Sequence, residues 1–373
     1  MKKSQRYKRI GSLGVGLFGA GCILLLLFYA DSAVLGVRQG LLLCRRTVIP
    51  ALFPFMVASE ILVGSGAAAA IGNAFARPAR IILGVPGAAA CPILLGALCG
   101  FPTGARAAAA LYDAGALSAN QCTRLLTFIN HPSSAYMISA VGISLFGSRR
   151  MGLLLWCISL ICAFATALLT RLLMPDNAHD SPPAKKPVCM SAGVVTGAVG
   201  AAAQGMLSVC AYVLFFSAVL SAVQSALSTL SLPAALSALL YGTLEMSGGI
   251  ARASEIANPT QAAMICAALS CWSGISVMCQ IMTVCRGRGF DFTPYLLAKA
   301  AQALCAAALT GLAVRYLLPL LPPENVHAAL LLPAETTQIL ITAANVTFAG
   351  TCAGLLFQKA TAHMHRRTVA DIY

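Results

Sequence analysis

The sequence predicts an all-α polytopic membrane protein whose two halves form an inverted repeat. The chain has 373 residues, of which 59% are hydrophobic and only 10% are charged, whereas soluble proteins carry about 25% charged residues. Apolar runs of about 18 residues or more, long enough to cross a bilayer, recur along the whole chain. The two halves also present their apolar runs and polar breaks in the same order. We therefore expect about eight spanning helices plus two re-entrant hairpins.

A proline-rich, charged linker divides the chain into halves and predicts five parts. They are an N-terminal helix with an interfacial helix, a first repeat, the cytoplasmic linker, a second repeat, and a C-terminal helix with a basic tail. Their residue ranges are 1–47, 48–173, 174–191, 192–318 and 319–373. The basic start and the following apolar run resemble a signal peptide, but the length of that run favours an uncleaved first helix.

Each repeat is expected to run as helix, broken segment, interrupted helix and plain helix. In the broken segments, LLGALCGFPTGARAAAAL (94–111) corresponds to LLYGTLEMSGGIARASEI (239–256). In the interrupted helices, FINHPSSAYMISAVG (128–142) corresponds to ALSCWSGISVMCQIM (268–282). If both broken segments are hairpins that return to the side they entered, the basic residues concentrate on the inner side, as the positive-inside rule requires. The first hairpin then enters from the inside and the second from the outside.

The polar breaks supply the candidate residues for binding a solute. Irregular backbone at membrane depth is tolerated only where protein or a water-filled cavity surrounds it, and the start of a half-helix suits an anionic or polar group. The candidates are Gly100, Phe101, Thr103, Gly104, Arg106, Asn130, Ser133, Ser134, Glu245, Ser247, Gly248, Trp272 and Ser273. Close helix packing is the alternative for the glycines, snorkelling to the surface for Arg106, and an interfacial anchor for Trp272.

Glu60, Glu245 and His131 are the candidates for carrying a coupling cation or a proton. A carboxylate in an apolar run is costly unless it is paired or hydrated, so such a residue is a functional candidate. We expect Glu245 to pair with Arg252 or Arg106, to bind the coupling cation, or to shuttle a proton. For His131, ordinary packing is the alternative.

Motifs and cysteine spacing predict neither a cofactor nor a metal site. Most of the 15 cysteines lie in apolar runs without any C-x-x-C pattern, so we expect them to serve packing. The net charge is +14, and the basic residues lie mostly between the apolar runs. The positive-inside rule explains this placement as a signal of membrane topology, so we expect no nucleic-acid partner. Without a phosphate-binding loop or H-E-x-x-H motif, the leading prediction is a secondary transporter and no enzyme. The alternatives are an intramembrane hydrolase using Ser65 and His131, and a non-transporting assembly component.

The segments LFPFMVASEIL, GFPTGARAAAALYDAGALSANQCTRLLTFINHPSSAYMISAVG and EMSGGI resemble the sporulation integral membrane protein YlbJ family. The resemblance covers roughly residues 40–320 and is strongest at 94–147. It implies two nucleoside-recognition (Gate) domains, related in plan to concentrative nucleoside transporters. Asn130 and Ser133 match the family pattern at the first interruption, whereas His131 departs from it.

The resemblance also implies a role, which is movement of dipicolinate across a membrane during endospore formation. A nucleoside or other metabolite permease is the alternative, and a peptidoglycan or lipid precursor would also fit the breaks. The implied location is the bacterial cell membrane, in the mother cell or around the forespore. The expected partners are a small-molecule solute, the lipid bilayer and a coupling cation, with a homo-oligomer left open.

Overall fold

The computed structural model of the protein describes residues 16–174, 192–230 and 232–317. These residues form helices and connecting turns, and none of them lies in a β-strand. The prediction of an all-α membrane protein is confirmed. The expected C-terminal helix with its basic tail and most of the linker lie outside the described residues.

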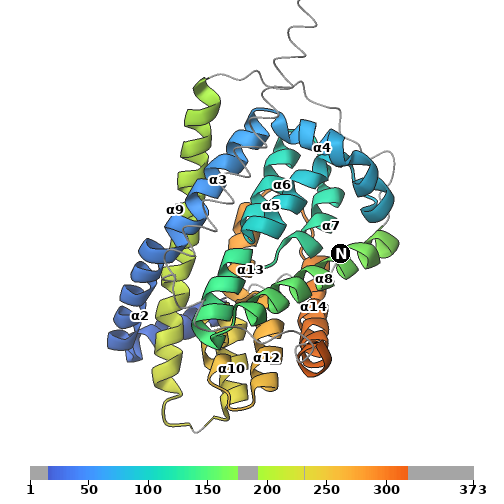
Figure 1. Ribbon diagram of the computed structural model, residues 1–373. Helices are drawn as coiled ribbons and strands as arrows, with labels where there is room; N and C mark the ends of the chain where they lie inside the picture. The colour runs from blue at the N-terminus through green and yellow to red at the C-terminus, as the bar shows by residue number, and fades with distance from the viewer. Residues whose placement is uncertain (1–15, 175–191, 231, 318–373) are drawn as a thin grey trace, which may run out of the picture.

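The N-terminal region packs along the long helix that opens the second half. A helix at Gly16–Phe28 turns by 100° into the next helix, where the interfacial helix was expected. This is α2 (Ala30–Leu43), which continues through the π-helical turn η1 (Cys44–Val48) into α3 (Ile49–Gly64). Both α2 and α3 lie beside α9 (Ala192–Ala226) (Figure 1). Close contact is possible because a Cβ at Gly36 would lie only 2.4 Å from the carbonyl oxygen of Ser217.

The first half then contains a helical hairpin, an interrupted helix and a plain helix. A connecting stretch of short helices, α4 (Ala67–Pro78), η2 (Ala79–Leu83) and η3 (Gly87–Ala89), leads from α3 to the hairpin. The remaining elements are α5 (Ala90–Cys99), α6 (Thr103–Asp113), α7 (Ala119–Ile129), η4 (Tyr136–Leu145) and α8 (Arg149–Leu173). A capping box formed by Ser118 and Gln121 fixes the start of α7.

The second half repeats this order after α9. Its elements are α10 (Ala234–Leu244), α11 (Met246–Ser254), α12 (Pro259–Trp272), α13 (Gly274–Val284) and α14 (Thr293–Leu312), extended by η6 (Ala313–Leu317). In each half the two hairpin helices pack against each other, α5 on α6 and α10 on α11. Figure 1 shows the first hairpin toward one end of α9 and α10 toward the other, as an inverted repeat requires.

Four helical stretches in the described residues are long and apolar enough to cross a membrane. They are 149–173, 193–226, 259–284 and 293–317, and two sharply bent helix pairs raise the number to as many as six. The expected spans therefore exist in part, and the count of about eight stays a prediction. Exposed leucines on these helices, such as Leu172 and Leu304 at 78% and 76%, suit contact with lipid.

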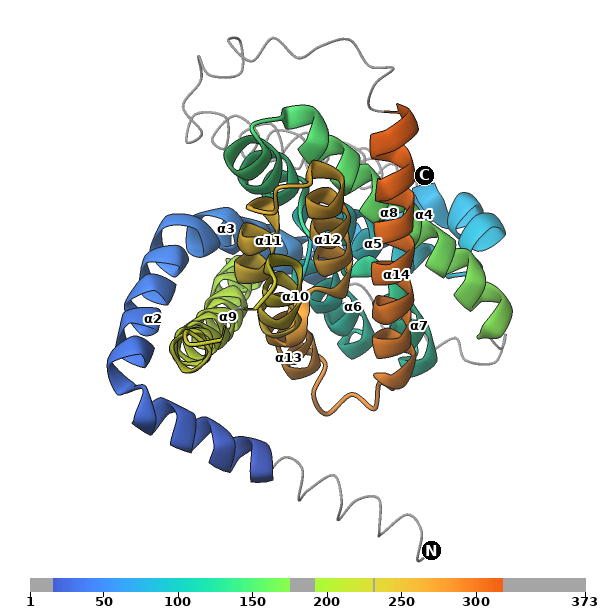
Figure 2. The ribbon, with the colours of Figure 1, turned by 90° about the horizontal axis from the view of Figure 1, so that it is seen from below.

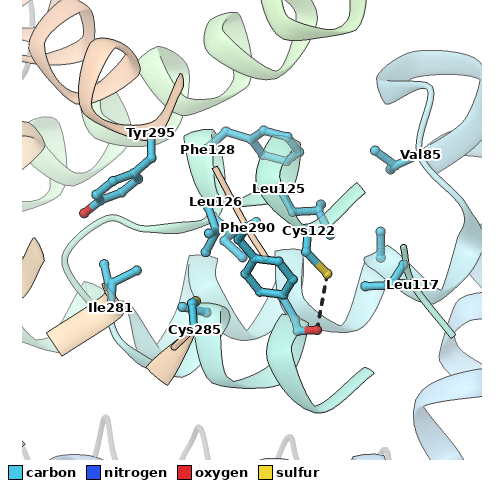
Figure 3. Close-up of a cluster of buried hydrophobic side chains, with 14 of the residues drawn as sticks. Val85, Leu117, Cys122, Leu125, Leu126, Phe128, Ile281, Cys285, Phe290 and Tyr295 are labelled. Atoms are coloured by element: carbon cyan, nitrogen blue, oxygen red, sulfur yellow. Dashed lines mark hydrogen bonds between the residues drawn. The ribbon is translucent and has the colours of Figure 1, made fainter. Parts of the chain in front are cut away.

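The two halves share one hydrophobic core. Leu125 and Leu126 of α7 face Ile281 and Cys285 from the end of α13, and Tyr295 of α14 lies beside them (Figure 3). Helix α14 packs against α12 of its own half and also against α7 and α8 of the other half (Figure 2). Because the two halves pack against each other in this way, the interrupted helices of both halves lie in the protein interior.

Candidate functional site

The first hairpin ends in a tip, residues 100–102, that rests on the interruption of the α7–η4 helix, residues 130–133. Gly100 has a φ of +74°, a left-handed value that favours glycine. A Cβ there would lie 2.5 Å from the backbone nitrogen of Ser133, so a side chain has no room. The backbone N–H of Phe101 donates to the carbonyl oxygen of His131 at 3.0 Å. The first tip and the first interruption therefore form one unit.

Helix α6 begins at Thr103 with an open N-terminus. Its N-cap residue is Pro102, and no side chain caps the first turn. The Thr103 side chain is 0% exposed, and its hydroxyl has no hydrogen-bond partner. The backbone N–H of Thr103 donates to the carbonyl oxygen of Gly100 at 3.0 Å. A helix N-terminus carries partial positive charge, so this buried end offers its following N–H groups and a hydroxyl to a polar or anionic group.

The first interruption holds further buried polar groups, and some of them are already used. Asn130 donates its amide to the carbonyl oxygen of Leu126 at 2.9 Å, while its own side-chain oxygen has no partner. His131 is buried, and its Nδ1 also has no partner. Ser133 accepts a hydrogen bond from the backbone of Tyr136, and Ser134 donates to the carbonyl oxygen of Leu98. Asn130 and His131 therefore keep unused hydrogen-bonding atoms, whereas the hydroxyls of the two serines support the backbone.

A fully buried lysine, Lys299 of α14, lies against this interruption, and the sequence analysis did not single it out. Its ammonium donates to the carbonyl oxygen of Asn130 and, at 3.1 Å, to the side-chain oxygen of Gln302. Gln302 in turn donates to the carbonyl oxygen of Thr127 at 2.9 Å and to the hydroxyl of Thr166 at 3.0 Å. The available signal was a lysine inside an apolar run, which is as unusual as a carboxylate there.

The second hairpin turns at Glu245, between α10 and α11, and at this second tip Glu245 caps the helix that follows it. Its two carboxylate oxygens accept hydrogen bonds from the backbone N–H groups of Ser247 at 2.9 Å and Gly248 at 2.7 Å. The expected pairing of Glu245 with Arg252 or Arg106 is wrong, because both arginines have other partners. The guanidinium of Arg252 stacks on the ring of Tyr241, 3.8 Å from its centre.

Arg106 forms an ion pair with Glu60, the other carboxylate expected to carry a coupling ion. The two side chains meet at 2.7 Å, and they are only 14% and 22% exposed. Arg106 also donates to the carbonyl oxygen of Ala201, so it ties α6 to α3 and α9. Arg106 therefore does not snorkel to the membrane surface, and the Glu60 carboxylate is not free.

The glycines of the two hairpins serve different purposes. Gly104 and Gly248 lie inside helices, where a Cβ would come within 2.9 Å of the carbonyl oxygen of Ile129 and 2.8 Å of a methyl group of Leu220. Close packing against backbone is therefore the role of Gly104, whereas Gly248 meets only the end of a flexible side chain, and the turn of the first tip depends on Gly100. At the interruption of α12–α13 in the second half, Ser273 and Gly274 both have a left-handed φ.

The second tip also rests on the interruption of its own half. A Cβ at Gly274 would lie 2.9 Å from the backbone nitrogen of Met246. The indole of Trp272 donates to the carbonyl oxygen of Thr243 at 3.4 Å, and Ser273 is fully buried. Helix η4 of the first half packs against α11, which links the first interrupted helix to the second hairpin.

The end of the first hairpin that lies away from its tip, at the last residue of α6, is joined to the second half by an ion pair. Arg288, in the loop after α13, donates to both carboxylate oxygens of Asp113 at 2.9 and 2.6 Å. This hydrogen bonding to Asp113 raises the pKa of Arg288. The ring of Tyr112 meets that of Phe290 edge-on at 5.1 Å, so the loop is held firmly on α6.

The described residues contain no cluster of three or more His, Cys, Asp or Glu side chains that could hold a metal ion. Every cysteine in this part of the chain is a free thiol, and most of these side chains are buried in the helical interior.

Fold and site together define a multi-pass integral membrane protein in which two hairpin tips rest on two interrupted helices. The chain is 27% identical over 304 residues to the sporulation integral membrane protein YlbJ of Bacillus subtilis (strain 168), a match that covers 72% of this chain and 74% of that protein. It is thus related to the YlbJ family of sporulation integral membrane proteins, as its sequence motifs predict. No family model and no solved structure matches the chain.

Proposed function

We propose that the protein is a secondary transporter that moves a small anionic solute across a bacterial membrane. The solute that the YlbJ resemblance implies is dipicolinate, a planar aromatic dianion, and the implied setting is endospore formation. Two broken elements in corresponding places of two halves are the arrangement from which transporters build a binding site near the bilayer midplane.

One observation carries the anionic specificity, namely the difference between the two hairpin tips. At the second tip, the carboxylate of Glu245 binds two backbone N–H groups at the start of α11. At the first tip, the corresponding position is Pro102, whose side chain has no acceptor to offer, and the Thr103 hydroxyl beside it is buried without a partner. A carboxylate from the solute would supply at the first tip what Glu245 supplies at the second.

The contacts of the first tip also suit a moving element. The tip is joined to the first interruption through backbone contacts at Gly100 and Phe101, while the body of α6 is tied to α3 and α9 by the pair of Arg106 and Glu60. A tip that shifts against the interruption could admit the solute while the ion pair keeps the hairpin in register. We propose this shift as the basis of alternating access.

Uptake by proteoliposomes tests the proposal. The purified full-length protein, reconstituted in lipid vesicles, is expected to take up radiolabelled dipicolinate faster than protein-free vesicles. Unlabelled dipicolinate should compete, and its neutral diamide should not. A nucleoside that competes as well as the dianion would favour the permease alternative. Absence of uptake of either solute class would contradict transport and favour an assembly component.

A further inference from the structure

The buried ammonium of Lys299 has a position that the proposed function does not use. It lies in α14, a helix of the second half, and it reaches the end of α7 in the first half. The Lys299 side chain is 0% exposed, the lowest value of any Lys or Arg side chain in the described part of the chain. A charge buried so deeply normally needs a counter-charge or hydrogen bonds. Its surroundings therefore need an explanation.

The ammonium is surrounded by neutral oxygen acceptors. It donates to the carbonyl of Asn130, the C-cap residue of α7, and to the side chain of Gln302. The ion pairs recorded in the described residues join Arg106 to Glu60 and Arg288 to Asp113, so neither involves Lys299. The titratable groups that face it are His131 of the first interruption, Cys162 of α8, and Cys271 of α12. No carboxylate among these groups balances its charge.

The end of α7 is a place where positive charge is favoured. The last carbonyl groups of a helix have no partners within the helix and carry partial negative charge. Asn130 and Gln302 satisfy the carbonyls of Leu126 and Thr127. The carbonyl of Asn130 itself is left to the ammonium. The side-chain oxygen of Asn130, also buried, has no partner. This set of oxygen atoms resembles the ligands of a small hard cation.

We propose that the Lys299 ammonium is a built-in cation that takes the place of a free coupling sodium ion. In transporters with broken helices, unwound carbonyls and the C-terminal ends of half-helices coordinate sodium. Here the same kind of position is filled by a cation attached to α14. The protein therefore folds and works without sodium, and removal of the ammonium leaves a vacant cation site. This inference goes beyond the proposed function, because it makes no use of the solute.

Thermal unfolding of the purified full-length protein tests the inference. Wild-type protein is expected to have the same Tm in sodium chloride and in choline chloride at equal ionic strength. Lys299→Ala should lower the Tm in choline, and sodium or propylammonium, which reproduces the deleted atoms, should restore at least half of the loss. Lys299→Met is the matched control, because it fills the space without a charge and leaves no room for a cation. It should lose stability and show no rescue.

Several results would overturn the inference. A specific stabilisation of the wild-type protein by sodium would show that the site is not already filled. A folded Lys299→Ala variant that neither sodium nor propylammonium stabilises would show that no cation site exists. If Lys299→Ala does not fold, a Lys299→Met variant as stable as wild type would show that the ammonium is dispensable. Because all these readouts are stabilities, they remain decisive even if dipicolinate is not transported.

Discussion

The two hairpin tips share a backbone plan but differ in what closes the start of their second helix. At the second tip, the chain supplies its own carboxylate, Glu245, to the first N–H groups of α11. At the first tip, α6 begins after Pro102 without any side-chain cap. Both tips rest on an interrupted helix through a glycine with positive φ, Gly100 in one half and Gly274 in the other.

This difference separates what the repeat needs for folding from what it keeps for function. The glycine contacts recur because each hairpin tip must approach a neighbouring backbone closely. The carboxylate does not recur, so one helix start is satisfied internally and the other is left for a ligand. The unused hydrogen-bonding atoms of Thr103, Asn130 and His131 belong to the first half, and so does the interruption that Lys299 contacts. The solute chemistry is therefore expected in the first half.

The largest effect should follow from making the first tip like the second. Pro102→Glu places a carboxylate at the start of α6, where it would cap the helix and exclude the carboxylate of a solute. We expect affinity for dipicolinate to fall by about tenfold or more, equivalent to at least ~1.4 kcal/mol, as measured by calorimetric titration. Pro102→Gln is the control, because it changes the backbone in the same way without adding charge, and it should bind more tightly than Pro102→Glu. Equal affinity of the two variants would contradict the comparison.

A smaller effect on stability is expected from the ion pair that holds the first hairpin. Glu60→Gln removes the negative charge that faces the partly buried Arg106, which keeps only neutral acceptors, and weakens its hold on α3. The free energy of unfolding should fall by about 1–3 kcal/mol, measured by thermal denaturation of the purified protein. In a double-mutant cycle, combining Glu60→Gln with Arg106→Gln should cost less than the sum of the single changes. Simple additivity would show that the pair contributes nothing specific.

The smallest effect is expected at the second tip. Glu245→Gln removes the charge of the α11 cap but keeps one acceptor oxygen, so the loss of stability should be about 1 kcal/mol, typical of a helix cap. Dipicolinate binding and accumulation should stay at the wild-type level, because this carboxylate is occupied by its own helix. A stable variant that binds the solute but no longer accumulates it would instead make Glu245 a coupling residue.

The sequence was sufficient to predict the elements of this fold but not their partners. Apolar length, glycine and proline placed both tips and both interruptions, because these signals are local. The ion pair of Arg106 and Glu60 joins residues 46 positions apart, and the hydrogen bond from Lys299 to Asn130 joins residues 169 positions apart. Local periodicity could therefore reveal neither contact. Similarly, composition could not tell Gly100, which makes the turn, from Gly104, which packs against Ile129.

The most direct test of the central claim compares two ligands on the wild-type protein. Dipicolinate and its neutral diamide have the same ring and nearly the same shape, so calorimetric titration of each isolates the role of negative charge. If the open start of α6 takes an anionic group, dipicolinate should bind about tenfold or more tightly than the diamide, and Thr103→Val should weaken the binding of dipicolinate. Equal binding of the two ligands, or tighter binding of the diamide, would contradict an anion site at the first tip.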